Sequence, residues 1–506
     1  MSANYFWDLI SANMPAPERR FADVSGRARI SYRDVLALSA RFAHALKRLN
    51  VAPGDRVAVQ VEKSPEALML YLACLRRGAA FVPLNTAYTA AEIEYFIKDA
   101  EPALFVCDPL RLNEYRKLPT IAATRTETLD ADGGGSVAAA AAEAPSEFEN
   151  AARDGGDLAA ILYTSGTTGR SKGAMLSHAN LASNALTLRD LWAFTRDDVL
   201  IHALPIYHAH GLFVATNVVL LAGASLIFQR QFRPADVLAA TRDATVLMGV
   251  PTFYTRLLQE PGLDCESVRQ MRLFISGSAP LLAETHKAWR DRTGHAILER
   301  YGMTETGMNA SNPYKGERVA GTVGFPLPDV ELRIADPETG APKKVDEVGM
   351  IEVRGPNVFG GYWRRPEKTA EEFRDDGFFI TGDMGRIDAR GYVHIVGRAK
   401  DLIITGGLNV YPKEVETEID LIPGVVESAV IGLPHADFGE AVTAVVVRRA
   451  GVDLSENDIF TALETRLAKF KNPKRVVFLS ELPRNAMGKV QKNVLREMIA
   501  AQDHDS

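Results

Sequence analysis

The chain has 506 residues, of which 46% are hydrophobic and 24% are charged, and its formal net charge is −6. This length exceeds one ordinary hydrophobic core, so two or more domains are expected. The acidic balance argues against a nucleic-acid-binding protein held by bulk electrostatics. The three cysteines, Cys74, Cys107 and Cys265, include no CxxC pair, which excludes a disulfide scaffold and a cysteine zinc site and suits a reducing cytoplasm. The first residues show no basic region followed by an apolar core, so we expect no signal peptide and no membrane span there.

The first half of the chain alternates helical and strand patterns. Residues 32–46 carry apolar side chains at helical spacing, residues 56–61 read as a strand, and residues 64–74 begin with a serine cap followed by proline. Further buried strands are predicted at residues 79–84 and 103–107. Strand–helix alternation of this kind predicts largely parallel sheets covered by helices.

The pattern changes twice later in the chain. Residues 131–152 contain a Gly-Gly-Gly-Ser run followed by alanines, which predicts a surface connection without a function of its own. Beyond residue 400, strand patterns flank a helix predicted over residues 455–470. We therefore expect an α/β fold, with a large domain of layered, largely parallel sheets over residues 1–399 and a small α+β domain over residues 400–506.

The most informative segment follows the apolar run at residues 158–163. It consists of Thr164, Ser165, Gly166, Thr167, Thr168, Gly169, Arg170, Ser171, Lys172 and Gly173. Glycines let backbone N–H groups approach an anion, hydroxyl groups add donors, and lysine adds a compact positive charge. The segment predicts a phosphate-binding loop. It lacks the order of the common NTPase loop, in which lysine follows glycine directly and Ser or Thr follows lysine.

Residues 299–305, Glu-Arg-Tyr-Gly-Met-Thr-Glu, form a second signature. The ring of Tyr301 can lie against a flat base that Gly302 allows to come close. Thr304 offers a hydroxyl group to a phosphate, and Glu305 is a hard oxygen ligand suited to Mg²⁺. Alone, this segment also fits an ordinary turn.

Three positions nearer the end of the chain are weaker signals by themselves. Asp383, in Thr-Gly-Asp, can accept hydrogen bonds from ribose hydroxyl groups, and Arg398 adds a guanidinium group. Lys489 ends Pro-Arg-Asn-Ala-Met-Gly-Lys on a glycine-containing loop. In isolation, each of these residues also fits a solvated surface.

The order of these segments resembles the superfamily of adenylate-forming enzymes, which includes acyl-CoA synthetases, peptide-synthetase adenylation domains and luciferases. The resemblance covers essentially the whole chain. It implies that the loop from Thr164 to Lys172 binds the β- and γ-phosphates of ATP. The remaining nucleotide roles fall on Gly277, Ser278, Ala279, Tyr301 and Gly302 at adenine, Thr304 at the α-phosphate, Glu305 at Mg²⁺, and Asp383 and Arg398 at ribose.

The resemblance also implies a mechanism in two steps. Lys489 matches the family's catalytic lysine, which bridges the substrate carboxylate and the α-phosphate, and Lys400 matches the hinge about which the small domain rotates. Thr304, Glu305 and Lys172 complete the expected catalytic set. The implied reaction forms an acyl-adenylate and pyrophosphate, after which the thiol of coenzyme A displaces AMP. Enzymes that modify lysine are expected as possible partners at Lys489.

Polar residues around the expected acyl pocket predict the acid. His208 and His210 lie in a segment that resembles the family's Pro-x-x-His-x-x-Gly motif, and Arg256, Ser278, Arg300 and Met303 are the further candidates. A buried cation calls for an anion, and the simplest anion is a second carboxylate on the substrate. The combination looks like the malonyl-CoA synthetases. Methylmalonate stays open, oxalate is the nearest alternative within the class, and each residue also fits a structural role, such as Arg256 pairing with Glu260.

Other classes remain as alternatives. An adenylation domain that loads a carrier protein would use the same ATP site, a luciferase-like oxygenase would need an apolar acid pocket, and a nucleotide-binding scaffold would not need Lys489. We expect a monomer that binds a small dicarboxylic acid, ATP and coenzyme A, and neither nucleic acid nor membrane.

Overall fold

The structure is a computed structural model that describes residues 4–164, 171–405, 408–435, 439–464, 466–467, 469–485 and 488–504. Its backbone contacts divide the chain into two compact units. Unit 1 comprises Met1–Glu331 and Val353–Phe379, and unit 2 comprises Leu332–Glu352 and Ile380–Ser506. The boundary expected between residues 399 and 400 lies inside unit 2. That boundary marks the expected hinge at Lys400, which a division by backbone contacts does not test, so it stays a prediction.

Two sheets form the centre of unit 1. The first sheet has the strand order β6 (Thr126–Thr128), β5 (Leu104–Cys107), β3 (Arg56–Gln60), β4 (Ala80–Pro83), β7 (Leu158–Thr164), β8 (Lys172–Ser177). The second sheet has the order β15 (Phe325–Pro326), β14 (Gly307–Ser311), β13 (Leu298–Met303), β12 (Leu273–Ser276), β11 (Val246–Gly249), β9 (Val199–His202), β10 (Ser225–Phe228), β1 (Arg20–Val24), β2 (Ile30–Ser31). The first sheet is parallel from β6 to β7, and the second is parallel from β13 to β1. The predicted class of parallel sheets with helices is confirmed.

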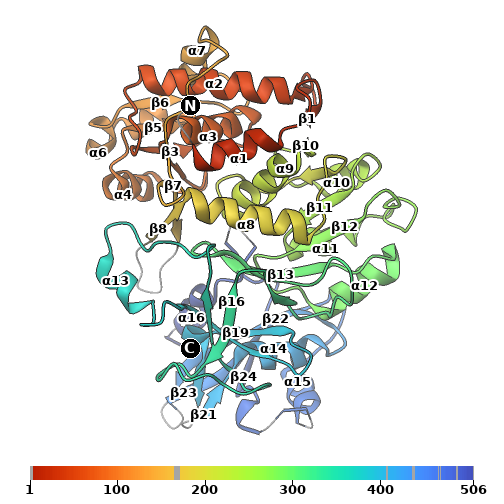
Figure 1. Cartoon of the computed structure of the whole chain (residues 1–506). Coiled ribbons are helices and arrows are strands. Elements are labelled where there is room, and N and C mark those ends of the chain that lie inside the picture. Colours follow the sequence, from red (N-terminus) through yellow and green to blue (C-terminus); the bar gives the residue numbers. More distant parts are fainter. Residues whose placement is uncertain are drawn as a thin grey trace. The chain divides into compact units, whose positions relative to one another are not determined.

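Helices cover both sheets of unit 1 (Figure 1). In chain order, the helices of unit 1 are α1 (Tyr5–Asn13), α2 (Tyr32–Arg48), α3 (Pro65–Arg77), α4 (Ala90–Ala100), η1 (Pro109–Arg111), α5 (Leu112–Tyr115), α6 (Pro119–Ala122), α7 (Ser136–Ala142), α8 (His178–Leu191), η2 (His210–Thr216), α9 (Asn217–Ala222), α10 (Pro234–Ala240), α11 (Pro251–Leu257), α12 (Ala283–Thr293) and α13 (Pro366–Glu371). The predicted cap of α3 is present, because the Ser64 side chain accepts a hydrogen bond from the N–H of Ala67 and Pro65 begins the helix. Apolar side chains of α4 pack on β3 and β5 in one buried cluster.

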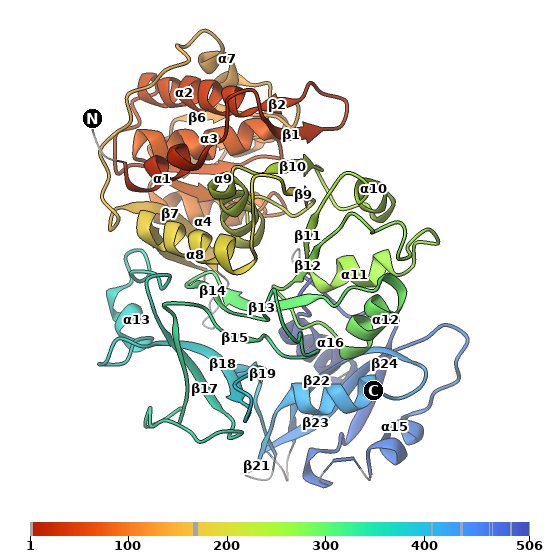
Figure 2. The same cartoon turned by 45° about the vertical axis from the view of Figure 1, so that its right-hand side comes forward.

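Aromatic side chains pack α11 and α12 against the second sheet. The Trp289 ring of α12 lies 4.9 Å from Phe274 of β12 and 5.0 Å from Tyr254 of α11. Figure 2 shows β9, β11 and β12 following one another beside these helices. This packing fixes the carboxyl ends of the parallel strands, where the candidate site begins.

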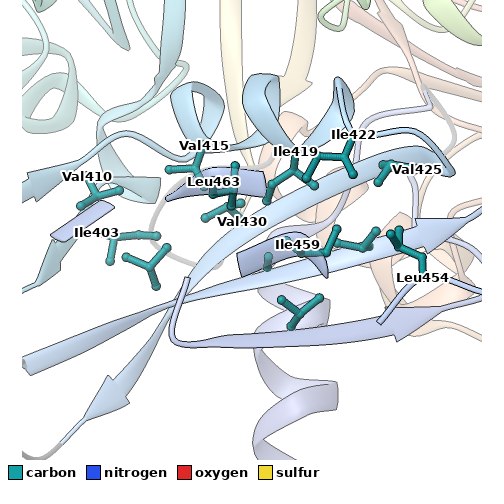
Figure 3. Close-up of a cluster of buried hydrophobic side chains, with 14 residues drawn as sticks. Ile403, Val410, Val415, Ile419, Ile422, Val425, Val430, Leu454, Ile459 and Leu463 are labelled. Atoms are coloured by element: carbon teal, nitrogen blue, oxygen red, sulfur yellow. The ribbon is translucent and has the colours of Figure 1, made fainter. Parts of the chain in front are cut away.

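Unit 2 contains two sheets. The third sheet, which lies mostly in this unit, has the order β16 (Glu331–Ala335), β17 (Gly349–Arg354), β18 (Phe379–Ile387), β19 (Val393–Arg398). The fourth has the order β21 (Leu408–Val410), β20 (Ile403–Thr405), β23 (Gly439–Arg448), β22 (Val425–His435), with β24 (Arg475–Leu479) paired to β23. The helices of the unit are η3 (Ala399–Asp401), α14 (Pro412–Asp420), α15 (Glu456–Leu463), η4 (Lys469–Lys471) and α16 (Lys492–His504). Figure 3 shows the core that joins α14 and α15 to the fourth sheet, with Val415, Ile419 and Ile459 among its side chains.

Two local expectations differ from the structure. The helix predicted over residues 455–470 ends as α15 at Leu463, and η4 follows at Lys469–Lys471. Pro473 disfavours helical backbone at the residue before it, which limits how far η4 can continue but does not reach the end of α15. The connection at residues 131–152 contains α7, because its alanines favour a helix and Val137 and Ala141 are buried.

Within the described residues, no helix is both long enough and apolar enough to cross a membrane.

Candidate active site

Several predicted site residues of unit 1 lie on or after parallel strands of the second sheet. His208 and His210 follow β9, residues 277–279 follow β12, and Arg300 to Gly302 lie on β13. Because β12 and β13 are adjacent and pair Ser276 with Glu299, the chain brings these last two segments together. Ligands of open α/β sheets bind at this edge, so the topology itself creates the site.

The base of the expected phosphate loop is described, and its tip is not. Thr164 ends β7 and pairs with Lys172 at the start of β8 across the antiparallel ladder. Ser165, Gly166, Thr167, Thr168 and Gly169 lie outside the described residues. The loop is therefore anchored with its hydroxyl and ammonium ends opposite each other.

Lys172 is held by a carboxylate that the sequence analysis did not select. Its Nζ lies 2.8 Å from Glu372 Oε1 and 4.1 Å from the centre of the Tyr362 ring. Burial would raise the pKa of Glu372, but the hydrogen bonds from Lys172 and Tyr362 outweigh it and lower that pKa. Glu372 is thus ionised and neutralises the lysine of the phosphate loop. A glutamate among the charged residues 364–375 gave no signal in the sequence that could have distinguished it.

Glu305 is buried and bound by hydroxyl groups. The hydroxyl of Tyr362 donates to Glu305 Oε1 over 3.0 Å, and the hydroxyl of Thr164 does so over 3.3 Å. Within the described residues, no group of three or more histidine, cysteine or acidic side chains could hold a metal ion. A single oriented carboxylate fits Mg²⁺, which commonly binds one or two carboxylates together with water and substrate phosphates.

The expected adenine side depends on close backbone approach. The ladder between β13 and β14 has an irregularity between Tyr301 and Gly302. A Cβ atom at Gly302 would lie 2.0 Å from the carbonyl oxygen of Gly307, so only glycine fits there. Tyr301 is 9% exposed, and Thr304 is half-buried beyond it. Ala279 is half-buried after β12, so the adenine candidates lie on or directly after the adjacent strands β12 and β13.

Arg300, His210 and Ser278 form a buried polar cluster. Arg300 is 4% exposed, and its Nε and Nη2 atoms have no hydrogen-bond partner among the described residues. Burial lowers the pKa of Arg300 to about 9, so the side chain is still cationic at neutral pH. His210 Nδ1 lies 3.3 Å from Ser278 Oγ, and His210 Nε2 has no partner within the described chain. Burial, and then the charge of Arg300, hold the pKa of His210 well below its usual value, so His210 is neutral.

The backbone around this cluster leaves little room. A Cβ atom at Gly277 would lie 2.5 Å from Arg300 Cζ, so the guanidinium group passes directly against that residue. Ser278 has a φ of +70°, a left-handed conformation that is uncommon for serine. Such strain occurs where a structure fixes a functional side chain.

The other candidates for the acid pocket lie differently. His208 is half-buried, and its Nδ1 accepts a hydrogen bond from the N–H of His210 over 3.4 Å. Met303 is half-buried on β13. Arg256 is exposed on α11, and no buried carboxylate contacts it in the described structure. Arg300 is the buried arginine whose charge acts on His210, and a role for Arg256 stays a prediction.

Sequence reasoning missed a buried pair behind the histidine segment. Lys63 Nζ lies 2.9 Å from His202 Nδ1, 2.8 Å from His202 O and 2.7 Å from Gln229 O. The other ring nitrogen, His202 Nε2, donates to Gly211 O over 2.9 Å, which fixes the start of the π-helix η2. In sequence, a lysine shortly after a strand looks like an ordinary surface residue, so only the fold reveals that Lys63 holds His202 in place.

The remaining candidates belong to unit 2. Asp383 is 4% exposed, and the Nε of Arg398 lies 2.8 Å from its Oδ1 across the β18–β19 ladder. Lys400 is exposed in η3, and Lys489 is exposed on a hairpin before α16. The structure thus joins Asp383 with Arg398, and Lys400 and Lys489 both belong to unit 2.

Known proteins share this architecture and these segments. Residues 11–363 match the AMP-binding enzyme family, and residues 414–489 match the AMP-binding enzyme C-terminal domain. The chain is 36% identical to feruloyl-CoA synthase of Amycolatopsis sp., over 93% of this chain and 94% of that protein. It is 34% identical to the malonate–CoA ligase of Arabidopsis thaliana, over 89% and 79%. The crystal structure of ATP-bound MatB from Rhodopseudomonas palustris is 60% identical, with a TM-score of 0.96 over 98% of this chain and 99% of that one.

These likenesses span nearly the whole chain. The segment from Thr164 to Lys172, residues 299–305 and Lys489 fall inside the two family matches, and residues 383–400 lie between them. The chain therefore belongs to the AMP-binding enzyme family, as an acyl-CoA ligase that resembles the malonate–CoA ligases.

Proposed function

We propose that the chain is an ATP-dependent malonate–CoA ligase, with methylmalonate as a second candidate substrate. A malonate oxygen attacks the α-phosphorus of ATP, the bond to the bridging oxygen of pyrophosphate breaks, and malonyl-adenylate forms. The thiol of coenzyme A then attacks the acyl carbon, and AMP leaves. Two anions must meet in the first step, so a cation between them lowers the barrier.

The buried Arg300 is the observation that carries the choice of malonate. A guanidinium group removed from water is costly unless an anion accompanies it, and the Nε and Nη2 atoms of Arg300 have no acceptor among the described residues. A second carboxylate on the acid would accept both hydrogen bonds in a bidentate pair. Ser278 and neutral His210 add further polar contacts, and they give a long alkyl or aromatic acid no apolar wall at this point.

Identity alone does not decide the acid. The chain is about as similar to a feruloyl-CoA synthase, at 36%, as to malonate–CoA ligases, at 34% and 36%. Ferulate has one carboxylate, so it would leave the Arg300 charge uncompensated. The buried cation therefore favours the dicarboxylate.

The nucleotide roles follow the family motifs. The segment from Thr164 to Lys172 would hold the β- and γ-phosphates, Tyr301 would lie against adenine, and Asp383 with Arg398 would hold ribose. Glu305 would bind Mg²⁺, which supplies positive charge at the phosphates when it is bound. Lys489 would join carboxylate and α-phosphate, with Lys400 as the hinge between the two steps.

A panel of acids tests this proposal. AMP release is measured with acetate, oxalate, malonate, methylmalonate, succinate, octanoate and ferulate, each with and without coenzyme A. We expect the highest kcat/KM with malonate, and release that depends on coenzyme A. A preference for ferulate, octanoate or acetate would refute the dicarboxylate pocket. Preference for oxalate would support the alternative within the class, and acid-dependent pyrophosphate exchange without transfer to coenzyme A would indicate loading of a carrier protein.

A further inference from the structure

The hairpin that carries Lys489 has a defined backbone on both arms. The N–H of Gln491 donates to Pro483 O over 2.8 Å, and the N–H of Asn485 donates to Lys489 O over 2.9 Å. The N–H of Lys489 donates to Asn485 Oδ1, also over 2.9 Å. Gly488 has a φ of +74°, a conformation that strongly favours glycine. The orientation of the Gly488 peptide therefore sets the direction in which Lys489 leaves the hairpin.

Both ends of the hairpin are anchored in a hydrophobic core. Leu482, just before the hairpin, is 4% exposed, and Leu495 of α16 is fully buried. They pack with Ile431 of β22 and Val445 of β23. The hairpin therefore starts and finishes on packed elements. The segment directly before Lys489 lies between these anchors and needs a contact of its own to hold it in place.

Arg484 supplies a connection between that arm and β22. Its Nη1 donates to Gly488 O over 2.6 Å, and its Nη2 forms an ion pair with Glu427 of β22. Burial raises the pKa of Glu427, and the charge and hydrogen bond of Arg484 oppose that rise. The planar guanidinium group presents donors in fixed directions, so it can hold a carboxylate and a carbonyl at once. The Gly488 carbonyl is thereby tied to a strand of the fourth sheet.

We propose that Arg484 is a positioning residue for the adenylation step, because it fixes the peptide next to Lys489. The proposal rests on the proposed function, since it assumes that Lys489 acts on the carboxylate and the α-phosphate. Thioester formation does not use that lysine in the mechanism above. Loss of the Arg484 connection should therefore slow one half-reaction and spare the other.

The experiment compares Arg484→Ala and Arg484→Lys with the parent enzyme. Lysine keeps the charge opposite Glu427 but lacks the planar fork, so it cannot span both partners in the same way. The first half-reaction is measured as malonate-dependent exchange of pyrophosphate into ATP. The second is measured as formation of malonyl-CoA from prepared malonyl-adenylate and coenzyme A.

We expect exchange to fall about 10- to 100-fold in both variants, the cost of a misplacement near 1 Å. The KM values for ATP and malonate, and the rate of the second half-reaction, should change less than about twofold, because Arg484 fixes a catalytic group and not a ligand. Lys471→Gln is the matched control. It removes another ion pair of unit 2, in which Lys471 Nζ lies 2.5 Å from Glu414, and it should leave both half-reactions unchanged.

Unchanged exchange in both Arg484 variants would overturn the proposal. So would an equal loss in both half-reactions, which indicates a general structural role. Arg484→Lys provides the answer if Arg484→Ala does not fold. Lys489→Ala tests the proposed function separately: if it retains full exchange, the role of Lys489 is wrong, whatever the Arg484 variants do.

Discussion

Two cations of unit 1 differ in how the protein compensates their charge. Lys172, at the base of the phosphate loop, lies 2.8 Å from Glu372 and faces the Tyr362 ring. Arg300, at the proposed acid pocket, has two donor atoms without a partner among the described residues. Both side chains are largely buried, at 10% and 4% exposed. The protein therefore supplies a counter-ion where it would bind triphosphate, and leaves that task to the ligand where it would bind the acid.

The difference has a physical consequence for binding. A ligand that approaches Lys172 must compete with Glu372, which weakens binding and eases the departure of pyrophosphate. A ligand that approaches Arg300 instead relieves an uncompensated buried charge, so its second carboxylate gains strongly. On the proposed function, selectivity for the acid and turnover of the nucleotide would thus follow from opposite arrangements of charge.

The strongest test removes the uncompensated cation. Arg300→Gln should lower kcat/KM for malonate by an amount equivalent to about 2–5 kcal/mol of lost transition-state stabilisation, because the second carboxylate loses its charged partner. Turnover of butyrate, a monocarboxylate, should not fall. Arg256→Gln is the matched control, and the exposure of Arg256 predicts a cost of about 0–1 kcal/mol. The opposite ranking of the two variants would make Arg256 the carboxylate-binding residue.

A smaller change displaces Arg300 without removing it. The Cβ atom of Gly277→Ala would lie 2.5 Å from Arg300 Cζ, so the guanidinium group must move. We expect kcat/KM for malonate to fall by an amount equivalent to about 1–3 kcal/mol of lost transition-state stabilisation, which is the usual cost of overpacking. The KM for ATP, measured in the same assay, reports on the adenine side of Gly277. If only the KM for ATP rises, Gly277 serves the nucleotide and not the acid.

The pH dependence of malonate use follows from the same cation. Burial lowers the pKa of Arg300 to about 9, and the cationic form binds the carboxylate. Malonate kcat/KM should therefore fall about tenfold per unit once the pH rises above about 9, whereas butyrate kcat/KM should not. Between about pH 6 and 8 no fall is expected from His210, because burial keeps it neutral there. A malonate profile that stays flat to pH 10 while Arg300→Gln is impaired would contradict the lowered pKa.

The smallest expected effect comes from the compensated cation. Glu372→Gln removes the charge that competes for Lys172, so inhibition by pyrophosphate should strengthen about two- to fivefold. The KM for ATP should fall for the same reason, and the KM for malonate should not change. Weaker inhibition by pyrophosphate would mean that Glu372 orients Lys172 for the phosphates, and the contrast between the two cations would disappear.

The amino-acid sequence was sufficient for the fold class, the cap of α3 and the identity of the residues at the strand ends, because these depend on local patterns of apolar, glycine and hydroxyl residues. It also predicted the family, since the order of short motifs is a property of the chain itself. It could not separate Arg300 from Arg256. Both are arginines in plausible segments, and burial of one and exposure of the other depend on how β12, β13 and α11 pack.

Tertiary structure alone decided the partners of the cations. Glu372 lies 200 residues from Lys172 along the chain, and Lys63 lies 139 residues from His202. No local pattern encodes such pairs, because a charged side chain in sequence looks the same whether it meets water or a distant partner. The folded chain determines which charges are compensated, and that distinction separates the proposed phosphate end of this site from the proposed acid end.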